Sequence, residues 1–536
     1  MSAYGDVAGE KVEQVSMPFP SRLLSRSLAI SILLLLLAAV FFRLSRFPGL
    51  EGDEAWVGLR ALSFLQDGFF SVHGMNWYTG APFEWLVAAT FSALGVNVFS
   101  LRLPGALLNW GAVALVMVTF RRRGNTPFYT ALLFASSLLF LYYSRLAWEI
   151  CALENFALAL IVLSLSRLSS TDNPKFADVF LFFGASAFAT WNHFTFLVAV
   201  LSFTVVGLFI LLRDRTPAGA RMFLLGSLNL VVPAALYCGK PHLRDGGFVS
   251  HALPALLGGA AFLAAVSFLF ITMDRQISPS LSRFAAAKPR LSKAVASLLV
   301  FCAFAGLIYT LREHLMTFFG TLSGVIMRER VVSYVPGPLD SIAGVLWAAV
   351  LLGIYLVFSV REMHFRGVTR PDLVKSALLI WPAVFFAIFT FVAPYTAERY
   401  YLIPHFLLLV ALALVLDEIS LSWSKVLATV LIVGFAQGQF FFWSEAMRIQ
   451  DRRPIEVRFG SYYNDKSAYF LRLDPLEDFL WKNGICEIKS SNYFISEPLK
   501  FLQEANPPVC RDARVAQIEY CTACRQPVPW FEIKYQ

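Results

Sequence analysis

The sequence predicts an all-α membrane protein of about 13 transmembrane helices followed by a small α/β module outside the cytoplasm. Hydrophobic residues make up 57% of its 536 residues and charged residues only 15%, with a mean hydropathy of +0.62. Soluble domains are about 25% charged. Apolar runs of membrane-crossing length recur, and Lys and Arg gather in alternate loops. Soluble enzymes, nucleic-acid-binding modules and disordered proteins are thereby excluded, and the lipid bilayer is the first expected partner.

Each expected span is an apolar segment of about 17–25 residues. They are 27–42, 103–120, 126–142, 150–166, 176–191, 194–212, 222–238, 252–273, 294–310, 339–360, 374–393, 401–416 and 425–443. The stretch 83–99 is also apolar, but it carries Glu84 and ends in Gly95 and Asn97. We expect an interfacial helix there.

The basic residues predict the orientation of the chain. With a cytoplasmic segment 1–26, the inner loops carry about twice as many Lys and Arg as the outer loops. The membrane domain is then 27–443, with a first outer loop at 43–102, and residues 444–536 lie outside the cytoplasm. No internal repeat is visible, which disfavours a transporter built of two symmetric halves.

The tail 444–536 combines mixed charge with the aromatic runs SYYNDKSAYFLRL and SSNYFI, which are typical of strands. Outside the cytoplasm its four cysteines predict two disulfides with three possible connectivities. A zinc site is disfavoured because the tail has no His, and free thiols are the remaining alternative. The four are Cys486, Cys510, Cys521 and Cys524.

Three carboxylates follow the first span within four residues, namely Glu51, Asp53 and Glu54. Such a group is costly beside a membrane unless it is solvated, paired or functional. The simplest interpretation is a helix N-terminus at which Asp53 is the cap and Glu54 interacts with the helix dipole. Catalysis is compatible with capping, because a cap is held rigidly.

Two further clusters lie at outer ends of spans. Arg145 and Glu149 are one helical turn apart, which favours an ion pair, and Glu154 lies deeper in the span. Arg399 is followed by Tyr400, and an arginine there either binds a phosphate or extends to the interface. Other outward-facing polar residues, either site lining or ordinary loop residues, are Asn192, His193, Lys240, His242, Arg312, His314, Arg328 and Arg330.

Taken together, DEAWVGLRALSFLQDG, SLRLPGALLNWGAVALVMVTFRR, YYSRLAWE and AERYYLIPHFLLLVALAL resemble the GT-C glycosyltransferases. The resemblance is greatest to the branch of the protein mannosyltransferases and the lipid A aminoarabinose transferase, and it runs from about residue 40 to about residue 415. It implies the GT-C fold and an inverting transfer of a sugar from a polyprenyl phosphate. The acceptor would be a lipid, a glycan or a protein, at the periplasmic face of a bacterial inner membrane. No nucleic acid is expected.

The resemblance also implies roles for individual residues. Asp53 matches the catalytic carboxylate and Glu54 its neighbour. Glu149 matches the acidic position of the second outer motif, with Glu154 as the alternative. Arg399 matches the Arg of an Arg-Tyr motif that holds the lipid phosphate.

The chain departs from the aminoarabinose branch at two phosphate-binding lysines. It reads Ala81-Pro82 at one position and Trp191-Asn192-His193 at the other. The residues that remain to neutralise or contact the phosphate are Arg145, His193, Lys240, Arg399 and Tyr400.

These residues suffice for a coherent reaction. Asp53 would be the general base for an acceptor hydroxyl, with Glu54 and Glu149 orienting the acceptor. A divalent cation, Mg²⁺ or Mn²⁺, held by Asp53 and Glu149 is a further option, and no other cofactor is expected. The alternative from another class is a transporter or flippase for a lipid-linked or anionic substrate. An oligosaccharyltransferase is disfavoured because its Trp-Trp-Asp-Tyr-Gly signature is absent, and a non-catalytic scaffold is the last alternative.

Overall fold

A computed structural model describes most of the membrane domain and part of the tail. The described residues are 22–68, 79–170, 175–214, 222–230, 314–320, 322–323, 338–364, 372–392, 398–419, 430–436, 439, 473–490, 493–507, 515–520 and 531–535. The spans expected at 252–273 and 294–310 lie outside them, as do Lys240, Cys510, Cys521 and Cys524, and the spans at 222–238 and 425–443 lie only partly within them.

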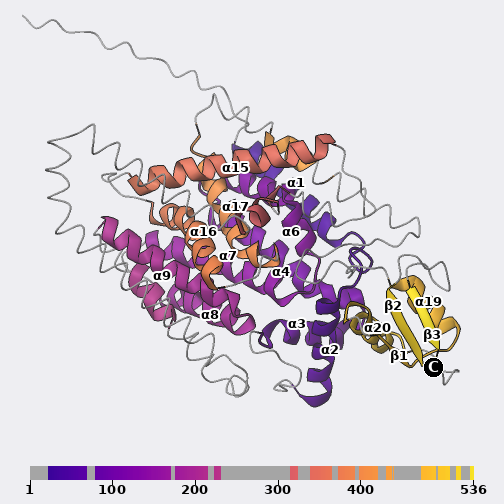
Figure 1. Ribbon diagram of the computed structural model, residues 1–536. Coiled ribbons are helices and arrows are strands. Elements are labelled where there is room, and N and C mark those ends of the chain that lie inside the picture. The colour runs from indigo at the N-terminus through magenta and orange to yellow at the C-terminus, as the bar shows by residue number, and fades with distance from the viewer. Residues whose placement is uncertain are drawn as a thin grey trace, which may run out of the picture.

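The described part of the membrane domain is helical (Figure 1). Its elements are α1 (Arg22–Phe41), α2 (Gly52–Asp67), α3 (Pro82–Leu94), α4 (Val98–Thr119), α5 (Thr126–Ser136), α6 (Leu138–Tyr143), α7 (Glu149–Ser170), α8 (Phe176–Asn192), α9 (Thr195–Asp214), α15 (Pro338–His364), α16 (Leu373–Val392), the 3-10 turn η4 (Glu398–Tyr401) and α17 (Leu402–Leu416). Within the described residues, six helices are long and apolar enough to cross a membrane: α1, α4, α7, α15, α16, and α17 with η4. A multi-pass membrane protein is therefore confirmed.

The helices pack around one large apolar core. α4 lies along α7, α7 along α8, and α9 along α16. Every residue of α17 is buried, which places this helix inside the bundle. Trp381 of α16 packs on Phe203 of α9 with ring centroids 5.0 Å apart, and its indole N–H donates to the carbonyl of Ala199. This bundle carries the ends of α7 and α17 to one place, where the candidate site lies.

Two expectations about helices are decided by the structure. α3 has 13 residues, which span about 20 Å and fall short of the roughly 30 Å hydrocarbon core, so 83–99 does not add a span. The single helix expected at 126–142 was wrong, because the chain breaks at Ser137. The Ser137 hydroxyl accepts from the N–H of Phe140 and bonds to Nε2 of His405, 2.7 Å away. The Ser137 hydroxyl thus caps a backbone N–H group at the start of α6, and His405 provides its hydrogen-bond partner inside the bundle.

The tail contains the expected α/β module. Its described elements are α19 (Asp474–Lys482), β1 (Ile488–Lys489), α20 (Tyr493–Ala505), β2 (Ala516–Tyr520) and β3 (Phe531–Tyr535). The sheet order is β1-β2-β3, with β1 parallel and β3 antiparallel to β2. Cys486 is disulfide-bonded.

The expectation of a strand at SSNYFI was wrong, because this run begins helix α20. Ile495, Leu499 and Leu502 recur at a helical period and enter the apolar core of the module. The aromatic residues alone favour a strand, but the helical spacing of the apolar residues that follow them determines the structure.

The module packs against helices α2 and α3. In Figure 1 α20 lies beside α2, and this is the most extensive contact of the module with the membrane domain. Phe501 of α20 is fully buried and packs on Phe91 of α3 at 6.0 Å. Its ring also lies over Gly58 of α2, where a Cβ would be 2.5 Å from the ring. Glycine at 58 thus allows the module to dock on α2.

We expect Gly58→Ala to loosen this docking. The added methyl group meets a buried ring, and overpacking of this kind costs about 1–3 kcal/mol. Limited proteolysis should release the tail faster than in the wild type. Gly184→Ala in α8 is the matched control, because its Cβ would meet only one atom, Phe180 Cε1 at 3.9 Å. Equal cleavage rates in Gly58→Ala and Gly184→Ala would contradict the docking role.

Candidate active site

The first acidic residues form a capping box at the start of α2. The cap is Glu51, so the expectation that Asp53 caps the helix was wrong. Glu51 Oε2 accepts from the N–H groups of Asp53 at 2.8 Å and Glu54 at 3.3 Å, and Glu54 Oε2 accepts from the N–H of Glu51. Since Glu51 satisfies the helix start, the Asp53 side chain is available for another role.

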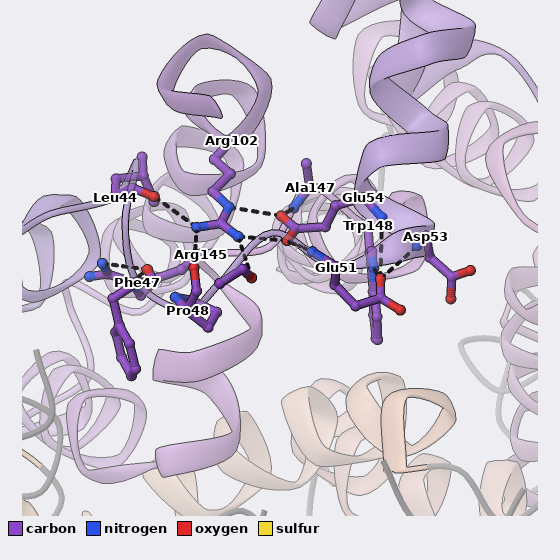
Figure 2. A network of polar contacts seen from close by, with 11 residues as sticks. Leu44, Phe47, Pro48, Glu51, Asp53, Glu54, Arg102, Arg145, Ala147 and Trp148 are labelled. Atoms are coloured by element: carbon purple, nitrogen blue, oxygen red, sulfur yellow. Dashed lines mark hydrogen bonds and ion pairs between the residues drawn. The ribbon is translucent and has the colours of Figure 1, made fainter. Parts of the chain in front are cut away.

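Glu54 is clamped by a buried arginine. Arg102 of α4 donates from Nε to Glu54 Oε1 at 2.9 Å and from Nη2 to Oε2 at 2.6 Å. The N–H of Ala147 donates to the same Oε1 at 2.7 Å, and both side chains of the pair are fully buried (Figure 2). Glu54 was expected to orient an acceptor. Its geometry instead makes it a positioning residue that joins α2, α4 and the loop before α7.

Arg102 also binds the chain that leads into α2. Its Nη1 donates to the carbonyls of Leu44 and Pro48, and its Nη2 donates to the carbonyl of Gly49. One side chain therefore fixes the whole turn between the first span and the acidic residues. The role of Arg102 was not predicted from the sequence, although an arginine in an apolar helix is a signal that it has a buried acidic partner.

Arg145 has a similar structural role. Its guanidinium donates to the carbonyls of Ala39, Phe42 and Phe47 over 2.5–3.0 Å and is fully buried. It was expected to neutralise a substrate phosphate. Because its donors are bound to carbonyls in the last turn of α1 and in the loop after it, they are not directed at a phosphate, and Arg145 holds this segment instead.

Asp53 and Arg399 meet although they are far apart in the sequence. Arg399 Nη1 lies 3.1 Å from Asp53 Oδ2, and the two side chains are 16% and 35% exposed. Arg399 begins the span that contains α17 and stacks over the rings of Trp148 and Tyr400, 5.3 and 5.2 Å from their centroids. Figure 2 shows the Asp53 carboxylate directed away from the Glu54–Arg102 network. Asp53 is therefore a partly exposed carboxylate at the start of α2, paired with an arginine of η4.

Glu51 is a site residue that the sequence analysis did not select. Its Oε2 also accepts from Nε1 of Trp148 at 2.8 Å, while Oε1 is buried and has no hydrogen-bond partner. Burial, together with the negative charges of Asp53 and Glu54, raises the pKa of Glu51 well above its usual range. Asp53, rather than Glu51, forms the ion pair with Arg399. The signal in the sequence was its position two residues before Asp53.

A second group of charges lies beside this pair. Glu149 is the first residue of α7 and interacts electrostatically with Glu84, Asp53 and Arg60. Its carbonyl accepts from the side-chain amide of Asn192 at 2.8 Å. Glu149 therefore lies within electrostatic range of Asp53, and their expected joint action on the acceptor or a cation stays a prediction.

His193 and Glu154 form a separate buried cluster. His193 Nδ1 lies 2.8 Å from the Thr195 hydroxyl and 3.9 Å from Glu154 Oε1. The Thr195 hydroxyl also lies 3.3 Å from Glu154. Both side chains are hydrogen-bonded within the bundle. The expected phosphate contact of His193 and the expected role of Glu154 as the alternative acidic residue stay predictions.

The tail brings Tyr493 near the acidic residues. It is the first residue of α20. Burial and the negative charges of Asp53 and Glu51 raise the pKa of Tyr493. The docked module therefore forms part of the electrostatic surroundings of the site.

A metal ion at this site would need free carboxylate oxygens as ligands. Within the described ranges no three His, Cys, Asp or Glu residues gather in a way that could hold a metal ion. Asp53 is bound to Arg399 and both oxygens of Glu54 are bound to protein donors. The cation expected at Asp53 and Glu149 stays a prediction, and no step of the reaction below is assigned to a metal ion.

No protein-family model matches the sequence, and no curated protein matches it. Among solved structures, the chain is similar to ArnT from Cupriavidus metallidurans in the apo state, with 13% identity over 73% of this chain and 76% of that chain and a TM-score of 0.34. The same protein bound to undecaprenyl phosphate gives 14% identity, 71% and 77% coverage, and a TM-score of 0.34.

The chain is also similar to the archaeal oligosaccharyltransferase AglB from Archaeoglobus fulgidus, solved with an inhibitory peptide and a dolichol-phosphate. The identity is 15% and the TM-score 0.44, and the match covers 77% of this chain but only 56% of AglB. These are similarities at 13–15% identity and TM-scores of 0.34–0.44. Superpositions this loose carry no argument about mechanism, which has to come from the side chains.

Proposed function

We propose that the protein is an inverting glycosyltransferase that moves a sugar from a polyprenyl phosphate to an acceptor hydroxyl at the extracytoplasmic face of a bacterial inner membrane. The observation that carries the proposal is the Asp53–Arg399 pair. It joins a partly exposed carboxylate to a guanidinium at the start of a span. A lipid phosphate at the membrane surface needs a cation at that depth, and an acceptor hydroxyl beside it needs a base.

The first step assigned to this pair is proton removal. Asp53 accepts the proton of the acceptor hydroxyl, and the acceptor oxygen forms a bond to the anomeric carbon. The bond from that carbon to the phosphate oxygen breaks, and its electron pair leaves with the lipid phosphate. The proton ends on Asp53. Attack opposite the leaving phosphate inverts the anomeric configuration.

The second role is stabilisation of the leaving group. A guanidinium has five N–H donors, so Arg399 can retain Asp53 with one and bind phosphate oxygens with others. The rings of Trp148 and Tyr400 hold its plane in place. Stabilising the charge that develops on a leaving oxygen is usually a large part of catalysis. The clamped Glu54 and the cap Glu51 keep Asp53 fixed for this geometry.

Arg399→Lys should weaken binding of undecaprenyl phosphate by roughly tenfold, because Lys keeps the charge but loses the two-pronged donor and the ring stacking. Binding to the purified protein in nanodiscs can be followed by native mass spectrometry. Arg167→Lys is the matched control, since Arg167 pairs with Asp178 at the far end of α7. If Arg399→Lys binds the lipid as tightly as Arg167→Lys, Arg399 only anchors the helix at the interface.

A further inference from the structure

A second polar pair lies along the same face of α2 as Asp53. Positions 53, 56 and 60 are spaced by three and four residues, so Asp53, Trp56 and Arg60 share one side of the helix. Arg60 is about 10 Å along the helix from Asp53. Its guanidinium lies over the ring of Trp56, 4.5 Å from the centroid. The helix that begins at the proposed base therefore also places a fixed guanidinium beyond it.

The guanidinium of Arg60 is held by one ion pair and is only partly used. Its Nη1 donates to Glu84 Oε1 of α3 at 2.8 Å, and the two residues are 4% and 0% exposed. Nε and Nη2 of Arg60 are buried and have no hydrogen-bond partner among the residues that the structure describes. Buried donors without an acceptor are costly, so native proteins seldom leave them unmatched. Two adjacent N–H groups in a fixed plane suit two neighbouring oxygen atoms.

The charges near Arg60 indicate which kind of ligand oxygen its two N–H groups would bind. Glu84 neutralises Arg60 directly, and Glu149 interacts electrostatically with Arg60, Glu84 and Asp53. The Arg60–Glu84 ion pair carries no net charge, so it gives no electrostatic preference for phosphate or carboxylate oxygens. Hydroxyl oxygens carry no charge and accept hydrogen bonds from such donors.

We propose that Arg60, fixed by Glu84, binds hydroxyl groups of a sugar through its Nε–H and Nη2–H and selects substrates that carry these hydroxyls. This proposal rests on the proposed glycosyltransferase function. The sugar belongs either to the lipid-linked donor or to the acceptor, and the chemistry is the same for both. Because a site built to bind a hydroxyl rejects an analogue that lacks it, Arg60 is a specificity residue.

The test compares Arg60→Lys with the wild type. Lys keeps a positive charge for Glu84 but loses the paired N–H donors. The donor arm measures binding of undecaprenyl phosphate and of its glucose- and mannose-linked forms in nanodiscs. A donor sugar at Arg60 predicts that a sugar-linked form loses roughly tenfold in affinity while the bare lipid binds as before.

The acceptor arm measures KM for an extract of envelope glycans. An acceptor sugar predicts a raised KM for the extract and unchanged binding of all three lipids.

Either result supports the proposal and identifies the source of the sugar. Weaker binding of the bare lipid would overturn it, since Arg60 would then hold the phosphate, and so would unchanged results in both arms. Failure of the wild type to bind undecaprenyl phosphate would instead refute the proposed function. Arg167→Lys is the control, and Arg60→Met with Glu84→Met removes the pair without leaving one charge buried alone. This double variant must reproduce the loss if Arg60→Lys does not fold.

Discussion

Replacing Asp53 by Asn is expected to lower the rate of sugar transfer by on the order of 10²–10⁴-fold in a protein that still folds. The amide of Asn keeps the shape of the side chain but cannot take up the acceptor proton. The structure sharpens this expectation, because Glu51 and not Asp53 caps α2. Loss of the Asp53 carboxylate therefore leaves the helix start intact, and a change in rate can be assigned to chemistry.

The measurement is initial-rate transfer together with thermal unfolding of the same preparation. Asp67→Asn is the matched control, since Asp67 is an exposed residue at the other end of α2. The Asp53–Arg399 ion pair is partly exposed, so its loss should cost little stability. Wild-type transfer by Asp53→Asn would refute the catalytic assignment, and Glu149 and Glu154 would be the next carboxylates to test.

Hydropathy predicted where most of the described spans lie, because burial in a bilayer requires a long apolar run. The break at Ser137 could not be predicted in this way. The polar partner that accompanies the break, His405, is 268 residues distant and becomes visible only in the folded bundle. The run SSNYFI was misread for the opposite reason, because its aromatic residues favour a strand locally while the following residues continue a helical period.

The candidate site likewise has features that could be predicted from the sequence and features that could not. The pairing of Asp53 with Arg399 agrees with the family resemblance, whereas spacing alone could not join residues 346 positions apart. Arg145 and Arg399 look alike in the sequence, since each is an arginine near aromatic residues at the end of an apolar segment. One binds backbone carbonyls and is buried, and the other faces a carboxylate. That difference depends on tertiary packing and is not present in either motif.

The second large effect concerns stability. Arg102→Met is expected to destabilise the protein by about 3–5 kcal/mol, the usual cost of removing one partner of a buried ion pair. The change leaves the Glu54 carboxylate buried without its charge partner. It also removes the donors to the carbonyls of Leu44, Pro48 and Gly49. The loop that positions Asp53 should therefore lose its order together with the stability.

Unfolding by increasing mole fractions of SDS, starting from the same mixed micelles, measures this loss. Arg123→Met is the matched control, because the Arg123–Asp372 ion pair is about one-third exposed and should contribute less than about 1 kcal/mol. A double variant, Arg102→Met with Glu54→Leu, removes both charges and should recover much of the lost stability. Transfer should remain low in the double variant, because Asp53 would still lack the turn that holds it. If Arg102→Met unfolds no more easily than Arg123→Met, the buried clamp does not stabilise the fold, and the rigid placement of Asp53 must come from the Glu51 cap alone.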